Sequence, residues 1–275
     1  MTSAPRSPMA SALPRPLDFS YPSNRLAAAG LVVGILGAKL LGHSWPGSLR
    51  VGLGIFSSWA IARELDPDAP QTASWAMPLA FAGLLGTPTD TEAGQTEGAA
   101  TLRHALPAFN ALSSLRSLVS TVGPATSGQD AAALSGLAAL SALTSGSVTR
   151  VLPGAALGVS MQLRDAFSPP PWSSTAALAA SVLPQQGRGA GNSLLGDVLS
   201  LAALGLGSHL AAPERINSRC DESPRRVSSE RVRAARLLGL GTLALGLLNR
   251  ETRSLSPLAA AVLSVGLRRW QAAQK

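Results

Sequence analysis

Charged side chains are scarce in this sequence, at 14% of its 275 residues, whereas about 25% is usual for a soluble domain. Apolar residues make up 46%, and the mean hydropathy is +0.22. A soluble protein of this length would have few charges with which to cover its surface, so the composition favours an integral membrane protein. We therefore expect membrane lipids to be its partners.

Aromatic residues and cysteine are also rare. Aromatics reach only 4%, and no basic stretch alternates with stacking side chains, so the net charge of +8 does not predict a nucleic-acid partner. Cys220 is the only cysteine, which excludes a disulfide within the chain. The three histidines have no zinc-ligand spacing, and no glycine-rich phosphate loop follows a strand, so we expect no cofactor.

Strand patterns are missing, because apolar and polar residues do not alternate at period two and β-branched residues do not cluster. The abundance of alanine, leucine and glycine predicts an all-α bundle of nine or ten helices. We place them at residues 26–43, 47–62, 71–86, 102–122, 130–148, 150–163, 172–183, 193–211, 229–249 and 257–270. The stretch 102–122 has apolar residues at three- and four-residue spacing, which is typical of an amphipathic helix.

Uncharged stretches at 69–89, 131–149 and 166–187 approach or exceed the roughly 20 residues that cross a bilayer. Other apolar segments, such as 51–62, hold only about a dozen residues, a length more typical of a buried helix in a soluble bundle. Arginines at their ends would lengthen the usable span by reaching the headgroups. The distribution of arginine then predicts a multi-pass protein of the cell (inner) membrane, with both termini in the cytoplasm.

Small residues form stripes along some predicted helices. Gly30, Gly34, Ala38 and Gly42 recur every four positions. Such spacing lets two helix backbones approach closely, so it predicts a tightly packed bundle.

An arginine followed by an acid occurs three times, each time after an apolar segment and seven positions before a proline. The pairs are Arg63 with Glu64, Arg164 with Asp165, and Arg250 with Glu251. We interpret this as an internal repeat that divides a single membrane domain, 26–275, into helical triplets at 26–86, 130–183 and 193–270. The extra helix 102–122, a polar loop at 212–228 and a disordered leader at 1–25 complete the predicted organisation.

The paired charges are neighbours in sequence, so on a helix they point in different directions and need not bond each other. Ion pairs between repeats would lock the triplets together or gate a cavity. The alternative is that these charges are solvated at the surface of the bilayer.

The segment 63–68 is the densest polar cluster near an apolar boundary. Glu64, Asp66 and Asp68 have the ligand chemistry for Mg²⁺, and Arg63 or Arg164 would hold a phosphate oxygen. The alternative is that the aspartates serve as turn and cap residues, because aspartate favours both places. The second and third repeats keep only the charged pair.

The sequence Arg63-Glu64-Leu65-Asp66-Pro67-Asp68 resembles a loop of uncharacterised polytopic membrane proteins of prokaryotes. The resemblance covers only a short part of the chain. It implies a membrane location and brings no activity with it.

Three functions remain open from the sequence. The first is a transporter-like or solute-permeation protein in which the charged pairs act as gates or locks. The second is a membrane-embedded enzyme that acts on a lipid phosphate or diphosphate. The third is a scaffold or assembly subunit. No catalytic motif decides among them.

Overall fold

The computed structural model describes residues 11–15, 17–85, 97–184 and 191–274. The prediction of an all-α fold is confirmed, since 71% of the described residues are helical and they contain no strand. The helices are α1 (Pro22–Leu40), α2 (Trp45–Leu65), α3 (Gln71–Leu85), α4 (Glu97–Val119), α5 (Gly128–Thr144), α6 (Leu152–Gln162), α7 (Ser173–Ser181), α8 (Leu194–Gly205), α9 (Gly207–Ala211), α10 (Ser229–Leu248) and α11 (Thr252–Ala273), with a 3-10 turn η1 (Val148–Val151) before α6.

The prediction of a multi-pass protein in a cell membrane is wrong. Among the described residues, no helix is both long enough and apolar enough to cross a bilayer. The uncharged stretches fail because they are not single helices. Only 15 residues of 69–89 are described as helix, in α3, and 166–187 contains a proline-rich loop followed by the nine-residue α7. The longest described helices, such as α11, contain arginines.

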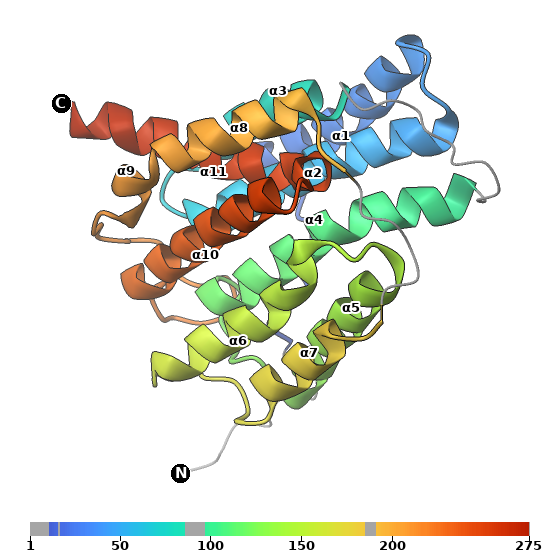
Figure 1. The fold of residues 1–275 in the computed structure, drawn as a ribbon. Coiled ribbons are helices and arrows are strands. Elements are labelled where there is room, and N and C mark those ends of the chain that lie inside the picture. Colours follow the sequence, from blue (N-terminus) through green and yellow to red (C-terminus); the bar gives the residue numbers. More distant parts are fainter. Residues whose placement is uncertain (1–10, 16, 86–96, 185–190, 275) are drawn as a thin grey trace.

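The helices form a bundle in which α2, α4 and α11 occupy the middle. Helix α2 packs against α1, α3, α4 and α11, and α11 also lies against α3 and α8. Helices α5, α6 and α7 pack on one another and form the other side of the molecule (Figure 1). Helix α4 lies between this group and α2, so it joins the two parts of the bundle (Figure 1).

Glycines allow α1 and α2 to approach closely. A Cβ atom at Gly34 would lie 2.3 Å from the Ile55 side chain, and one at Gly52 would lie 2.7 Å from the carbonyl oxygen of Leu31. The small-residue stripe of α1 therefore packs against α2. Its last member, Gly42, lies beyond the helix with φ +90° and forms the turn between the two helices.

Hydroxyl and carboxylate side chains fix several helix starts. Ser44, Ser127 and Ser193 each accept a hydrogen bond from a backbone N–H in the first turn of α2, α5 and α8. Asp130 completes a capping box with Ser127, because its carboxylate accepts the Ser127 N–H. These caps set where each helix begins, and the start of α5 also anchors a segment near the N-terminus.

Candidate functional site

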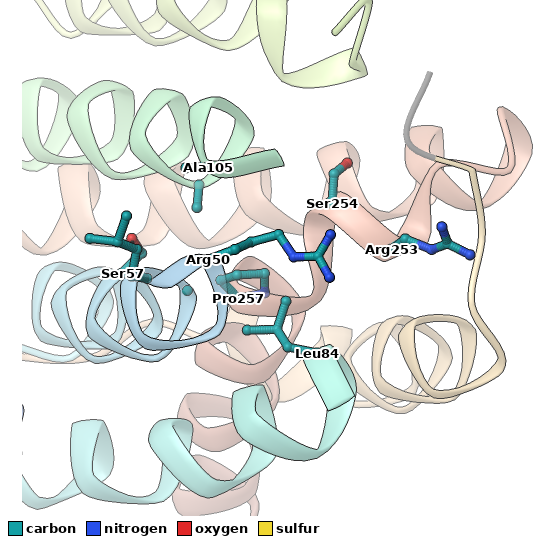
Figure 2. Close-up of a pocket in the computed structure, with 10 residues that line it drawn as sticks. Arg50, Ser57, Leu84, Ala105, Arg253, Ser254 and Pro257 are labelled. Carbon is teal, nitrogen blue, oxygen red and sulfur yellow. The ribbon is translucent and has the colours of Figure 1, made fainter. Parts of the chain in front are cut away.

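A small cavity lies where the start of α2 faces the start of α11. Arg50, Ser254 and Pro257 are among its lining residues (Figure 2). Its volume of about 10 Å³ is enough for one water molecule at most. This cavity is therefore too small for a ligand.

A larger cavity lies beside the C-terminal half of α2, and Glu64 is one of its lining residues. This carboxylate is fully buried. The Arg116 Nε donates to its Oε1 at 2.7 Å, and the hydroxyl of Thr121 donates to its Oε2. A second guanidinium, that of Arg15, lies 3.9 Å from Oε1. Glu64 thus gathers two arginines that are far from it in the sequence.

Residues 11–15 form a strap across α4 that places Arg15 at the cavity. The N–H of Ala12 donates to Asp130 at 3.1 Å, and the Arg116 Nη1 donates to the carbonyl oxygen of Leu13 at 2.8 Å. Arg15 itself forms an ion pair with Asp221 at 2.7 Å. This part of the segment expected to be a disordered leader therefore has defined contacts, while residues 1–10 and 16 lie outside the described residues.

The cavity has a volume of about 130 Å³ and both polar and apolar lining residues. Its polar lining consists of Arg15, Asn24, Arg63, Glu64 and Arg116, and its apolar lining consists of Leu17, Phe56, Trp59, Ala60 and Leu112. The rings of Phe56 and Trp59 are tilted by 35°, with centroids 5.8 Å apart.

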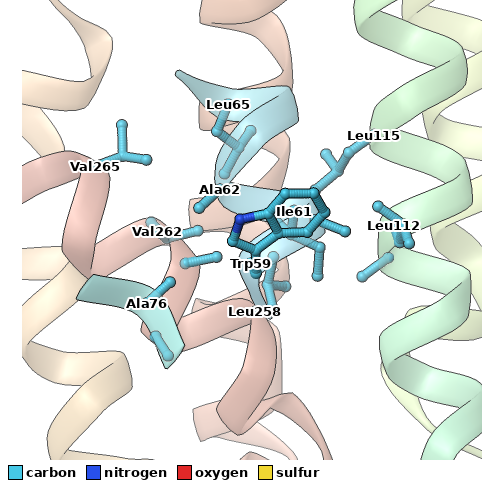
Figure 3. Packing of buried hydrophobic residues seen from close by; sticks show 14 of the residues in the cluster. Trp59, Ile61, Ala62, Leu65, Ala76, Leu112, Leu115, Leu258, Val262 and Val265 are labelled. Atoms are coloured by element: carbon cyan, nitrogen blue, oxygen red, sulfur yellow. The ribbon is translucent and has the colours of Figure 1, made fainter. Parts of the chain in front are cut away.

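Trp59 is held in place by the core. Its ring is 6% exposed and packs among side chains of three helices, which include Leu115 of α4 and Leu258 of α11 (Figure 3). Because close packing fixes the side chain, the aromatic wall of the cavity is rigid.

Arg63 differs from the other two arginines of the cavity. Within the described residues, its guanidinium makes no hydrogen bond and no ion pair within 4.0 Å, although the side chain is half-buried. Burial, and after it the charge of Arg15, lower the pKa of Arg63. The cavity therefore contains a positive charge that the nearby side chains do not neutralise by direct contact.

The carboxylates around the cavity respond differently to burial. Burial acts to raise the pKa of Glu64, but the two arginines and the Thr121 hydroxyl outweigh it, so this pKa lies below its ordinary value. Burial raises the pKa of Asp221, and the attraction of Arg15 does not cancel the effect. The surroundings of Glu64 therefore favour its charged form, whereas those of Asp221 disfavour the charged form.

The three carboxylates predicted as metal ligands point to different partners. Glu64 bonds Arg116, Asp66 bonds Arg268 and Thr72, and Asp68 accepts two backbone N–H groups of the loop 217–218 at 2.8 Å. In the described part of the chain, no three histidine, cysteine, aspartate or glutamate side chains are grouped to hold a metal ion. The geometry therefore does not support the metal-site hypothesis.

Asp66 belongs to a separate buried network between α2 and α11. The Arg268 Nε donates to it at 2.9 Å, and Arg236 lies 3.8 Å away. Both arginines also contact Glu214, at 3.1 and 2.8 Å respectively. Burial raises the pKa of Asp66 in spite of the two arginines. We interpret this network as a structural connection, because the arginines and carboxylates contact one another.

The other paired charges separate into acids that bond distant segments and arginines that are exposed. Asp165 accepts two hydrogen bonds from Arg231 of α10, at 2.6 and 2.7 Å, and Glu251 accepts the N–H of Val148 at 2.8 Å. Arg164 and Arg250 are exposed, and both have positive φ, at 48° and 56°. The acids thus join distant helices, whereas these two arginines lie at the surface.

Sequence reasoning missed Arg15 and Arg116 as site residues. Arg15 lies in a segment whose composition indicated disorder. Arg116 is an arginine among the apolar positions of α4, four positions after Leu112 and three before Val119, and this interruption was the one available sign that the helix contacts a charged group there.

The chain matches no protein-family model, no curated protein and no solved structure. A functional conclusion therefore depends on the chemistry of the cavity.

Proposed function

We propose that this protein binds a small anion in the cavity between α2, α4 and the strap, with Arg15, Arg63 and Arg116 as binding residues. The observation behind the proposal is the half-buried Arg63, which has no carboxylate within 4.0 Å among the described residues. Burying a charge without a partner is costly, so a bound anion would stabilise this arrangement.

The unused donors of the three arginines support the proposal. Arg15 uses Nε and Nη2 for Asp221, and Arg116 uses Nε and Nη1 for Glu64 and the strap. Arg15 Nη1, Arg116 Nη2 and the whole guanidinium of Arg63 have no hydrogen bond to the described residues. A guanidinium binds carboxylate and phosphate groups through paired N–H donors, so these oxyanions are the expected ligands.

Binding of oxyanions to the purified full-length protein tests the proposal. Isothermal titration calorimetry with inorganic phosphate and with acetate, at low salt, should detect saturable binding. The variant Arg63→Gln should weaken it by about tenfold or more, because a hydrogen bond to a charged group is lost. Arg233→Gln, at an exposed position of α10, is the matched control and should bind like the wild type. Absence of binding for both anions, or equal affinity of wild type and Arg63→Gln, would overturn the proposal.

A role as an assembly subunit is a second candidate, favoured by exposed apolar side chains on neighbouring helices. Leu40 of α1, Trp75 of α3 and Leu194 of α8 are 88%, 71% and 79% exposed. Large exposed apolar surfaces mark contact sites. Light scattering over a range of concentrations should show association that Leu40→Ser weakens; a monomer at every concentration would count against self-assembly.

We also propose that the triplets 26–86, 130–183 and 193–270 are copies of one helical unit. In support, Arg164 and Arg250 occupy the same place, directly after the C-cap of α6 and α10, with positive φ. Arg63 differs because α2 continues to Leu65. The first unit would then have extended its helix and turned this arginine toward the cavity.

A further inference from the structure

We infer that the anion bound in this cavity carries a flat apolar ring next to its charged group, as an arene carboxylate or an aryl phosphate does. This inference rests on the proposed function and narrows its ligand class. It follows from the mixed polar and aromatic lining of the cavity, from its size and from the strap that holds Arg15 in place.

The lining contains both guanidinium groups and aromatic rings. Arg63 and Phe56 lie seven positions apart on α2, which brings them to the same face of the helix. Trp59, between them, lies on that face as well. Aromatic rings prefer tilted or offset partners, and the tilted pair of Phe56 and Trp59 offers such a surface to a third ring. A ligand with one charged end and one flat end would contact both kinds of lining residue.

The volume argues against a bare oxyanion. One water molecule needs about 10–15 Å³ of cavity volume measured in this way. A cavity of about 130 Å³ therefore holds on the order of ten non-hydrogen atoms. Phosphate or acetate alone would leave about half of this space empty or filled with water beside apolar walls. A six-membered ring with one oxyanion group fits the available volume.

The strap fixes the position of Arg15 in the lining. Arg15 is tied to Asp221 by two contacts of 2.7 and 2.8 Å, and the strap behind it is fastened to Asp130 and Arg116. Its guanidinium is therefore already held where it can contact the charged group of the ligand.

A series of carboxylates with equal charge tests the inference. Calorimetry with acetate, cyclohexanecarboxylate and benzoate separates charge, size and flatness. Benzoate should bind about tenfold or more tightly than acetate, because its ring buries apolar surface. It should also bind about 2- to 10-fold more tightly than cyclohexanecarboxylate, which has similar size but no flat face.

The variant Phe56→Leu should remove the preference for benzoate over cyclohexanecarboxylate. Phe81→Leu, at a half-buried position of α3 outside the cavity, is the matched control and should keep the preference. If the three carboxylates bind equally, or cyclohexanecarboxylate binds at least as tightly as benzoate, the inference is overturned and the anion site stands. If no anion binds, the proposed function itself is overturned.

Discussion

Replacing Glu64 by alanine is expected to lower the free energy of unfolding by about 3–5 kcal/mol, the usual cost of removing one partner from a buried ion pair. Glu64 is fully buried, and its removal leaves Arg116, only 13% exposed, without its carboxylate. Arg15 is 27% exposed and keeps its ion pair with Asp221, so the loss of Glu64 destabilises it less. Because water can reach part of both guanidinium groups, we expect a value near the lower end, about 3 kcal/mol.

Urea unfolding followed by circular dichroism measures this loss. A loss of about 3 kcal/mol corresponds to a fall in Tm on the order of 10 °C for a chain of this size. The matched control is Glu222→Ala, at an exposed glutamate in the loop beside Asp221, which should unfold like the wild type.

A double-mutant cycle separates the ion pair from packing. Glu64→Gln combined with Arg116→Gln should be more stable than the sum of the two single effects predicts, by about 1–3 kcal/mol. A loss below about 1 kcal/mol for Glu64→Ala would be typical of a surface pair and would refute the reasoning.

Three further outcomes are expected. The folded-state pKa of Glu64 lies below its ordinary value. Its contribution to stability is therefore present above the unfolded pKa of about 4.3 and is lost as the pH falls through the folded pKa. Urea unfolding at several pH values should show that the wild type loses stability below about pH 4 more steeply than Glu64→Gln does. Gly52→Ala should lower the free energy of unfolding by about 1–3 kcal/mol, because its Cβ would lie 2.7 Å from a backbone carbonyl of α1. Gly136→Ala, with no atom within 4 Å of its Cβ, should raise the free energy of unfolding by about 0.5–1 kcal/mol. Thermal unfolding of both variants compares them. Arg231→Lys should lower the free energy of unfolding in urea by about 2 kcal/mol, because lysine cannot reproduce the two parallel hydrogen bonds to Asp165. A stability equal to that of the wild type would contradict the bidentate geometry.

Local sequence patterns predicted the helices well. The predicted range 71–86 agrees with α3, and 229–249 agrees with α10. The predicted helix 193–211 is two helices, because the chain breaks at Leu206, between Gly205 and Gly207. This break accounts for finding eleven α-helices in the described residues where nine or ten were predicted.

The membrane prediction failed because an uncharged stretch of bilayer length does not have to form one helix of that length. Composition does not show where a chain turns, and the prolines at 169–171 and a loop interrupt the stretch 166–187. The resemblance of the segment 63–68 to loops of membrane proteins stays an untested prediction, and its implied membrane location has no support from the described helices.

The cavity could be predicted only in part. Arg63 and Glu64 were singled out from the sequence, because a charged pair at the end of an apolar segment is unusual there. Arg116 contacts Glu64 across 52 positions of sequence, and Arg15 reaches it from a strap without secondary structure. Such long-range contacts follow from tertiary packing and leave no local pattern.

The ion pairs between distant segments have a consequence for how this bundle finds one arrangement. Helix faces made of alanine, glycine and serine have small side chains of similar size. Two such helices can therefore shift relative to each other by one turn and still pack well. A slip at α6 and α10 would strand the fully buried Arg231 away from Asp165, and one at α2 and α4 would strand Arg116 away from Glu64. We therefore expect these few charges to choose among otherwise similar alignments, much as a single polar residue sets the register of a coiled coil.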